Sequence, residues 1–214
     1  MALTLAAPTA IMQALQQEQG ATMSHPCEVF ADTVLAGLAA QNGEGPVEND
    51  QRLVPGLYVS WDDDKGKVTL RRTAEKEATL GLTARITQAP RWITLNIDLG
   101  PGRFEPGDIL GLAADLESDR PLRLDAFVRS AGEDGHEDSR LPDALNAAPG
   151  GVVQTSLLTV HAAHGLTRNS RFHTLVFRLP DNDFSLTLRG FQLFVLPAGR
   201  GLQTGSLTLA DASG

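Results

Sequence analysis

The sequence predicts an all-β protein: a jelly-roll β-sandwich of about nine antiparallel strands with a short helical N-terminal segment. Short runs that alternate apolar and polar residues recur along most of the 214 residues. The 21 glycines and 12 prolines fall mainly between these runs, as turn residues do in β-proteins. Within the β-region no helical pattern separates the runs, and the crossover helices that parallel strands need are therefore missing.

Two short amphipathic helices are expected near the N-terminus. The first spans residues 9–18, where Ile11, Met12 and Leu15 recur at helical spacing. The second spans residues 28–40 and has its apolar residues on one side. Such helices pack against the sandwich or against another subunit, so residues 9–40 are also a candidate surface for a protein partner or a homo-oligomer.

A polar stretch, QNGEGPVENDQ at residues 41–51, marks the expected start of the β-domain. The chain is therefore divided into a helical segment and linker at 1–50, a β-sandwich at 51–200 and a C-terminal tail at 201–214. Strands are expected at residues 57–61, 67–72, 79–87, 91–99, 108–117, 121–130, 151–161, 171–179 and 184–196. A turn sequence at residues 62–66 predicts that the first two pair as a hairpin, and a change of phase at Gly190 predicts a β-bulge or a strand that crosses between sheets.

Composition limits the possible partners. The formal net charge of -8 and the pI near 5.0 argue against binding to nucleic acid or to anionic membranes. No run approaches the roughly 20 apolar residues that span a bilayer. The N-terminus lacks the basic start of a signal peptide, which leaves the location unknown: cytoplasmic, or exported or assembled by a route without a cleaved signal. A single cysteine, Cys27, excludes an internal disulfide.

The candidate binding residues lie on the polar sides of two predicted strands. In a strand, alternate side chains point to opposite faces, so an apolar side toward the core leaves the other side for solvent or ligand. Aromatic rings beside amide, carboxylate and guanidinium groups favour sugar recognition. Seven residues form this predicted ligand-binding set: Trp92, Asn96, Asp98, Arg123, Asp125, Phe127 and Arg129. The alternative is that Trp92 is covered and that the charged members form ordinary surface ion pairs.

Catalytic, metal and cofactor sites are not predicted. The sequence has no nucleophile elbow, P-loop or dinucleotide motif. His25 and Cys27 are separated only by Pro26, but nearness in sequence is not catalytic geometry. The acids of the long segment 130–150 could bind calcium, although their spacing favours a solvated loop. His161, His164 and His173 have the wrong spacing for a zinc motif. We therefore expect no enzyme and no cofactor.

The stretch from residue 92 to residue 198 resembles the jelly-roll, galactose-binding-like modules of carbohydrate-active and cell-surface proteins. The resemblance lies in the order of WITLNIDL, GDILGLAADLES, LRLDAFVRS, a long loop, TLVFRLP and FSLTLRGFQLFVLPAG. It implies a binding role, with the ligand on one sheet face or in the loops at one end. The chain departs from the pattern in having only 2 Trp and 1 Tyr.

Three functional hypotheses follow. The first is a non-catalytic module that binds a glycan or polysaccharide, or attaches to a surface, through the seven residues, which should then gather in one groove. The second is a structural subunit of a larger assembly, such as a virion- or particle-type spike, docked through its N-terminal segment. The third is a glycoside hydrolase, which needs two carboxylates roughly 5–10 Å apart in a cleft.

Overall fold

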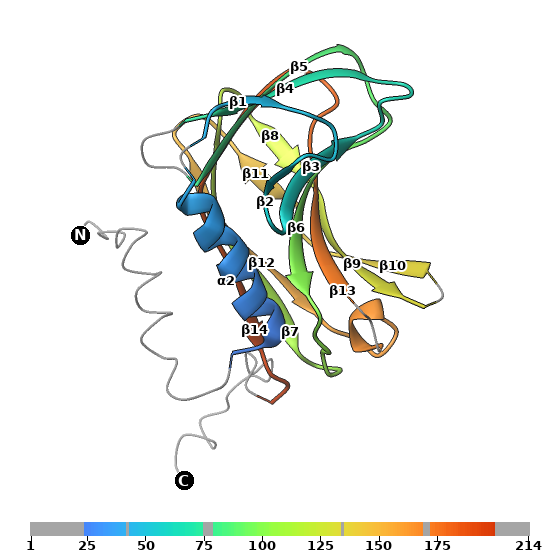
Figure 1. Ribbon diagram of the computed structural model, residues 1–214. Helices are drawn as coiled ribbons and strands as arrows, with labels where there is room; N and C mark the ends of the chain where they lie inside the picture. Colours follow the sequence, from blue (N-terminus) through green and yellow to red (C-terminus); the bar gives the residue numbers. More distant parts are fainter. Residues whose placement is uncertain (1–23, 42, 75–78, 134, 169–171, 200–214) are drawn as a thin grey trace, which may run out of the picture.

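The computed structural model describes residues 24–41, 43–74, 79–133, 135–168 and 172–199. Two antiparallel six-stranded sheets pack face to face (Figure 1). The predicted helix at residues 9–18 and the predicted tail at residues 201–214 lie outside the described residues.

The first sheet has the strand order β1-β4-β5-β14-β7-β12. Its strands are β1 (Gly45–Val47), β4 (Lys67–Thr73), β5 (Leu80–Gln88), β14 (Phe184–Leu196), β7 (Ile109–Ser118) and β12 (Val152–Thr159). The second sheet has the order β10-β9-β13-β6-β3-β2. Its strands are β10 (Gly135–Arg140), β9 (Ala126–Gly132), β13 (Phe172–Arg178), β6 (Ile93–Gly100), β3 (Leu57–Trp61) and β2 (Arg52–Val54). A small pair, β8 (Leu122–Leu124) and β11 (Leu145–Ala147), and a short 3₁₀ turn, η1 (Gly165–Thr167), complete the described elements.

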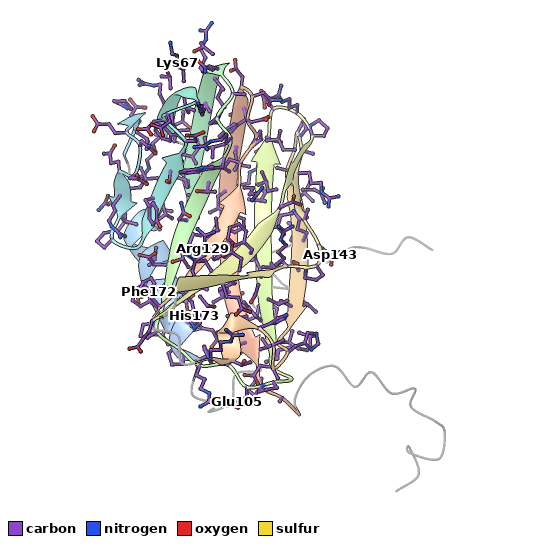
Figure 2. The ribbon with its side chains drawn as sticks, turned by 90° about the vertical axis from the view of Figure 1, so that its right-hand side faces the viewer. Lys67, Glu105, Arg129, Asp143, Phe172 and His173 are labelled. Atoms are coloured by element: carbon purple, nitrogen blue, oxygen red, sulfur yellow. The ribbon has the colours of Figure 1, made fainter. Side chains whose placement is uncertain are left out.

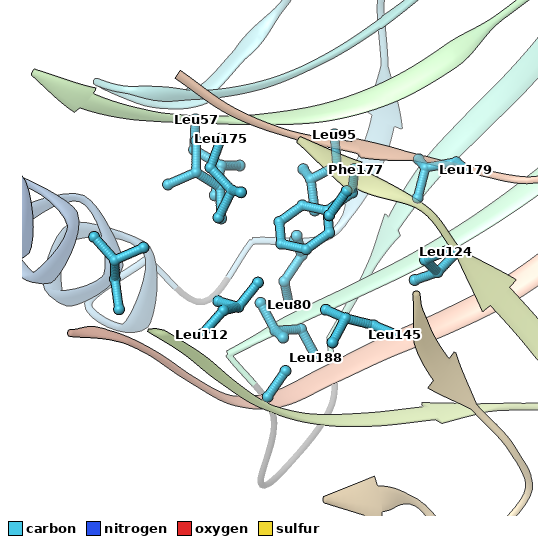
Figure 3. Packing of buried hydrophobic residues seen from close by; sticks show 14 of the residues in the cluster. Leu57, Leu80, Leu95, Leu112, Leu124, Leu145, Leu175, Phe177, Leu179 and Leu188 are labelled. Atoms are coloured by element: carbon cyan, nitrogen blue, oxygen red, sulfur yellow. The ribbon is translucent and has the colours of Figure 1, made fainter. Parts of the chain in front are cut away.

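The core lies between the two sheets and is closed at its sides by other elements. Figure 3 shows Leu95 and Phe177 of the second sheet facing Leu112 and Leu188 of the first. Leu124 of β8 and Leu145 of β11 lie at one side of this cluster, and a helix lies at the other (Figure 3). That helix, α2 (Pro26–Ala39), contributes buried apolar side chains to the same core. Its apolar face thus packs against the sandwich, one of the two uses that the sequence predicts.

Helix α2 begins at a capping box that also serves a neighbouring strand. The backbone N–H of His25 donates to Oε2 of Glu28 at 2.7 Å, and the His25 ring accepts from the backbone N–H of Cys27 at 3.2 Å. The second carboxylate oxygen, Oε1, accepts from the backbone N–H of Val195 in β14. Because β5 pairs with β14 only as far as Leu188, this later part of β14 has an open edge, and α2 lies along it (Figure 1).

The expected hairpin of residues 57–61 and 67–72 is wrong, although both strands exist. Strand β3 pairs with β2 and β6, whereas β4 pairs with β1 and β5 in the other sheet. The connection is held by a long-range contact: Asp62, buried after the end of β3, accepts from Nε of Arg91 at 2.6 Å and from its second guanidinium nitrogen at 3.1 Å. The aspartates and the glycine of residues 62–66 predict a turn, but turn composition does not distinguish a hairpin from a crossing between sheets.

The segment expected as a long irregular loop at 130–150 contains strands. Residues 135–140 form β10, which pairs with β9 in regular antiparallel register. Its acids are not free: the guanidinium of Arg129 holds Asp138, with two N–O distances of 2.8 Å. The bulge predicted at Gly190 is confirmed, since the register of β14 against β7 shifts between Leu188 and Gly190.

Candidate functional site

Four of the seven predicted residues lie together on the outer face of the second sheet. Asn96 and Asp98 project from β6, and Phe127 and Arg129 project from β9, with β13 between the two strands. In Figure 2 this sheet faces the viewer and Arg129 lies in the middle of its length. The alternation along β6 and β9 therefore assigns these four side chains to the correct face.

The groups on this face are already paired with one another. Asp98 accepts from the guanidinium of Arg52 at 3.1 Å and from the hydroxyl of Thr174 at 3.4 Å. The amide of Asn96 donates to the hydroxyl of Thr94 at 3.1 Å. The bidentate hydrogen bonds from Arg129 hold the pKa of Asp138 below its usual value.

The aromatic rings on this face are covered by arginines. The guanidinium carbon of Arg129 lies 5.3 Å from the ring centroid of Phe127, and that of Arg52 lies 5.2 Å from the ring centroid of Tyr58. Phe127 is only 8% exposed, so the expectation of an exposed ring at this position is wrong. Burial, and then the charge of Asp98, raises the pKa of Tyr58. A sugar would have to displace these arginines before it could stack on either ring.

The other three predicted residues, Trp92, Arg123 and Asp125, line a separate groove at one end of the sandwich. The groove has a volume of about 430 Å³, within the range of roughly 300–1,000 Å³ typical of ligand sites. Its walls are the loop before β6, the region around β8 and the loop that joins β13 to β14. We call it the Trp92 groove; it is lined by Arg91, Trp92, Ile93, Arg120, Pro121, Leu122, Arg123, Asp125, Arg178, Leu179, Pro180, Asp181 and Asn182.

Trp92 gives this groove an available aromatic surface. Its side chain is 41% exposed, and among the described residues it is the one aromatic side chain that is well exposed. Its place follows from its neighbours, since the backbone carbonyl of Trp92 accepts from the N–H of Asp62 and the next residue, Ile93, is buried in the core. The ring of Trp92 therefore lies at the end of the sandwich, and the strand that follows it enters the core.

The loop walls of the groove are fixed by side-chain hydrogen bonds. Arg91 is held by Asp62, whose pKa is lowered by these hydrogen bonds. Arg120 donates to Oδ1 of Asn182 at 2.6 Å and also to the carbonyl oxygen of Asp183. The contact of Arg91 joins the loop before β6 to the turn after β3, and the contacts of Arg120 join the region before β8 to the loop between β13 and β14.

The seven predicted residues thus divide between two places and do not gather in one groove. On β13, Arg178 lines the groove and Thr174 lies on the polar face. The two residues are four positions apart, so the two places are separated by about 13 Å along the strand. The β8 segment causes the division, because the predicted single strand 121–130 breaks at Asp125 into β8 and β9. Arg123 therefore lies in β8 and Asp125 at the break, whereas Phe127 and Arg129 lie in β9.

A second polar groove of about 380 Å³ adjoins the first and shares Arg123 with it. Its other lining residues are Pro142, Asp143, Ala144, Leu145, Asn146, Gln154, Thr155 and Ser156. The amide of Gln154 donates to the backbone carbonyl of Asn146 and accepts from its N–H, which links β12 to β11 across this groove. A chain-like ligand could thus continue past Arg123.

The groups considered for catalysis do not form a reactive site. Burial, and then the charge of Glu28, raises the pKa of Cys27 to about 12, so its thiol stays protonated at neutral pH. The Nδ1 atom of His25 accepts a hydrogen bond from the backbone N–H of Cys27, so this contact involves the backbone of Cys27 and not its thiol. Asp98 lies on the polar face and Asp125 in the Trp92 groove, and their backbone positions are about four strand residues, roughly 13 Å, apart along β13.

No group of three or more histidine, cysteine, aspartate or glutamate side chains is placed to hold a metal ion in the part of the chain that is described. His173 is instead buried, with Ser130 Oγ at 2.9 Å from Nδ1 and the carbonyl oxygen of Gly102 at 2.7 Å from Nε2. No described helix is both long and apolar enough to cross a membrane.

Three arginines of the Trp92 groove are not among the residues predicted from the sequence: Arg91, Arg120 and Arg178. Each lies in or beside a turn, where the alternation of a strand does not predict the face toward which a side chain points. A weak signal was present, since all three adjoin or closely precede a turn that contains proline at residues 90, 121 and 180. Turns at the same end of a sandwich can share a surface, but only the sheet order shows which turns do.

No family model matches the sequence, and no curated protein matches it either. Among solved structures, a CBM4 carbohydrate-binding module is 13% identical with a TM-score of 0.50, covering 75% of this chain and 97% of that chain. The CBM22-1 xylan-binding domain of Paenibacillus barcinonensis Xyn10C is 13% identical with a TM-score of 0.47, covering 72% of this chain and 95% of that one. At this identity, the CBM4 likeness shows a shared fold, and the predicted all-β jelly-roll sandwich is confirmed.

Proposed function

We propose that the protein is a non-catalytic carbohydrate-binding module that holds a glycan or polysaccharide in the Trp92 groove. The exposed ring of Trp92 at the wall of a 430 Å³ groove carries this proposal. A flat apolar ring suits the C–H face of a pyranose, and the side chains of Arg123, Asp125 and Asn182 offer donors and acceptors for hydroxyl groups.

The polar face is the weaker of the two candidate positions. Its rings lie under the guanidinium groups of Arg52 and Arg129, and those arginines are in turn paired with carboxylates. Breaking a bidentate arginine–carboxylate pair would cost part of the binding free energy. The proposal therefore assigns ligand contact to Trp92, Arg123 and Asp125, and a structural role to Asn96, Asp98, Phe127 and Arg129. The fold likeness to a carbohydrate-binding module supports the general function and not the position of the ligand.

A glycan array probed with matched variants tests the proposal. The wild-type chain should bind at least one saccharide class, and Trp92→Ala should weaken that binding by roughly tenfold or more, because a stacking aromatic is a typical energetic centre of a binding site. Val153→Ala removes another exposed apolar side chain, on β12, and should leave binding unchanged.

Arg129→Ala distinguishes the two positions. This change removes the cover of Phe127 and the partner of Asp138, so it should lower the melting temperature while leaving affinity for the glycan unchanged. Loss of binding in Arg129→Ala together with normal binding in Trp92→Ala would move the site to the polar face. Absence of binding to every saccharide by a folded wild-type chain would refute the proposed function.

A further inference from the structure

We propose, resting on the proposed function, that the Trp92 groove selects an anionic saccharide whose carboxylate or sulfate group is bound by Arg178 and Arg123. The charge of the groove is opposite in sign to the charge of the whole chain. Four arginines and two aspartates line it, in a protein with a formal net charge of -8. The carboxylate of Asp62 compensates the charge of Arg91, and the remaining lining residues carry a surplus of one positive charge in a chain that is acidic as a whole.

Two of the four arginines are occupied within the protein. Arg91 is bound in bidentate fashion by the buried carboxylate of Asp62. Arg120 donates to the side chain of Asn182 and to the backbone of Asp183. These two guanidinium groups build the walls of the groove and have few donors left for a ligand.

The other two arginines are available. Arg123 has only a loose contact with Asp125 at 3.6 Å, in which both side chains are well exposed, at 75% and 67%. The exposed side chain of Arg178 makes no hydrogen bond or ion pair with any side chain in the described parts of the structure. Its backbone is fixed, because its N–H donates to the carbonyl oxygen of Asp125 at 2.8 Å.

These positions fit the recognition of a charged sugar. A guanidinium presents a planar pair of donors that matches the two oxygens of a carboxylate or sulfate group. Arg178 and Arg123 line the same groove as Trp92, so one sugar could stack on the ring while its acidic group meets an arginine. A neutral sugar would leave Arg178 without an anionic partner, and the groove should therefore prefer the acidic form.

The test compares acidic oligosaccharides with their neutral counterparts. Hexamers of galacturonate, glucuronate-containing oligosaccharides and alginate oligosaccharides are titrated calorimetrically beside the same compounds after carboxyl reduction. Sulfated galactan oligosaccharides and their desulfated forms make up the second arm. At least one acidic compound should bind roughly tenfold or more tightly than its neutral counterpart, and added salt should reduce this preference.

Arg178→Gln should lower the ratio of the affinity for the acidic form to the affinity for the neutral form by roughly threefold or more, because it removes one of the two guanidinium groups assigned to the acidic group. Arg85→Gln is the matched control, because it removes another exposed positive charge from a strand, β5, that does not line the groove. The two arms show whether a carboxylate or a sulfate is the group recognised. Equal binding of acidic and neutral forms that still depends on Trp92 would overturn this inference and leave the proposed function standing. Absence of binding by both forms would overturn both.

Discussion

At the scale of single residues, arginine has opposite uses on the polar face of the second sheet and in the Trp92 groove. Arg129 and Arg52 lie over aromatic rings and pair with carboxylates, so they cover the polar face. Arg178 lies in an open groove and has no such partner among the described side chains. This difference is caused by neighbouring residues on other strands, so it cannot be predicted from the local sequence around each arginine.

His173 is a residue whose titration we expect to differ between the folded and the unfolded chain. Burial lowers its pKa, since the protonated ring would be charged inside the protein. In NMR titration its ring should therefore protonate at a midpoint below the usual value of about 6.5. The chain unfolded in urea is the control, where the same ring should titrate near that usual value.

The lowered pKa of His173 makes the folded protein less stable as the pH falls. Between the two pKa values the unfolded chain binds more protons at His173 than the folded chain, so this residue makes the free energy of unfolding fall as pH decreases below about 6.5. The contribution is present above that pH and is lost toward the folded pKa, with a slope of at most about 1.4 kcal/mol per pH unit. A folded-state midpoint at or above 6.5 would contradict the buried, neutral ring.

At the scale of elements, the sequence predicts the strands better than their pairing. Alternation of apolar and polar residues along 93–99 predicts β6 and its core-facing side correctly, although Asn96 and Asp98 on its other side are also buried. The alternation does not show that β3 and β4 belong to different sheets. The connection between them is held by the contact of Asp62 with Arg91, which are far apart in the chain, and a local pattern does not contain such a contact. The alternation of strands likewise selects Trp92, Arg123 and Asp125 of the groove, whereas Arg91, Arg120 and Arg178, which lie in or beside turns, cannot be selected in this way.

Glu28 connects two elements, and its replacement should destabilise both. Glu28→Ala removes the capping box of α2 and the acceptor for the edge of β14, and we expect the free energy of unfolding to fall by about 1–3 kcal/mol. Glu28→Gln, which keeps one acceptor oxygen, should lose less. Urea denaturation measures the difference, with Glu44→Ala as the control at an exposed glutamate. Equal stability of Glu28→Ala and wild type would show that the carboxylate makes no net contribution.

At the scale of the whole molecule, the central question is where the folding unit begins. The sequence predicts a β-domain that starts at residue 51, because the polar stretch at 41–51 has the composition of a linker. In the structure, part of that stretch forms β1, which pairs with β4. Helix α2 places Ala31, Val34 and Leu38 in the same cluster as both sheets. A polar stretch rich in turn residues can thus belong to the folded domain and does not by itself mark a linker.

Deletion of residues 1–50 tests this boundary. The deletion removes β1 and the helix that closes one side of the core, and buried apolar side chains of both sheets would be exposed to water (Figure 3). We expect the truncated chain to lose its cooperative thermal unfolding transition. Val34→Ala in the full chain offers a milder form of the same test: it should lower stability by about 1–3 kcal/mol, whereas Val29→Ala, at a side chain 54% exposed, should change it little. A truncated chain that still unfolds cooperatively would show that residues 51–200 fold independently, as the sequence predicts, and that α2 is an attachment to a complete sandwich.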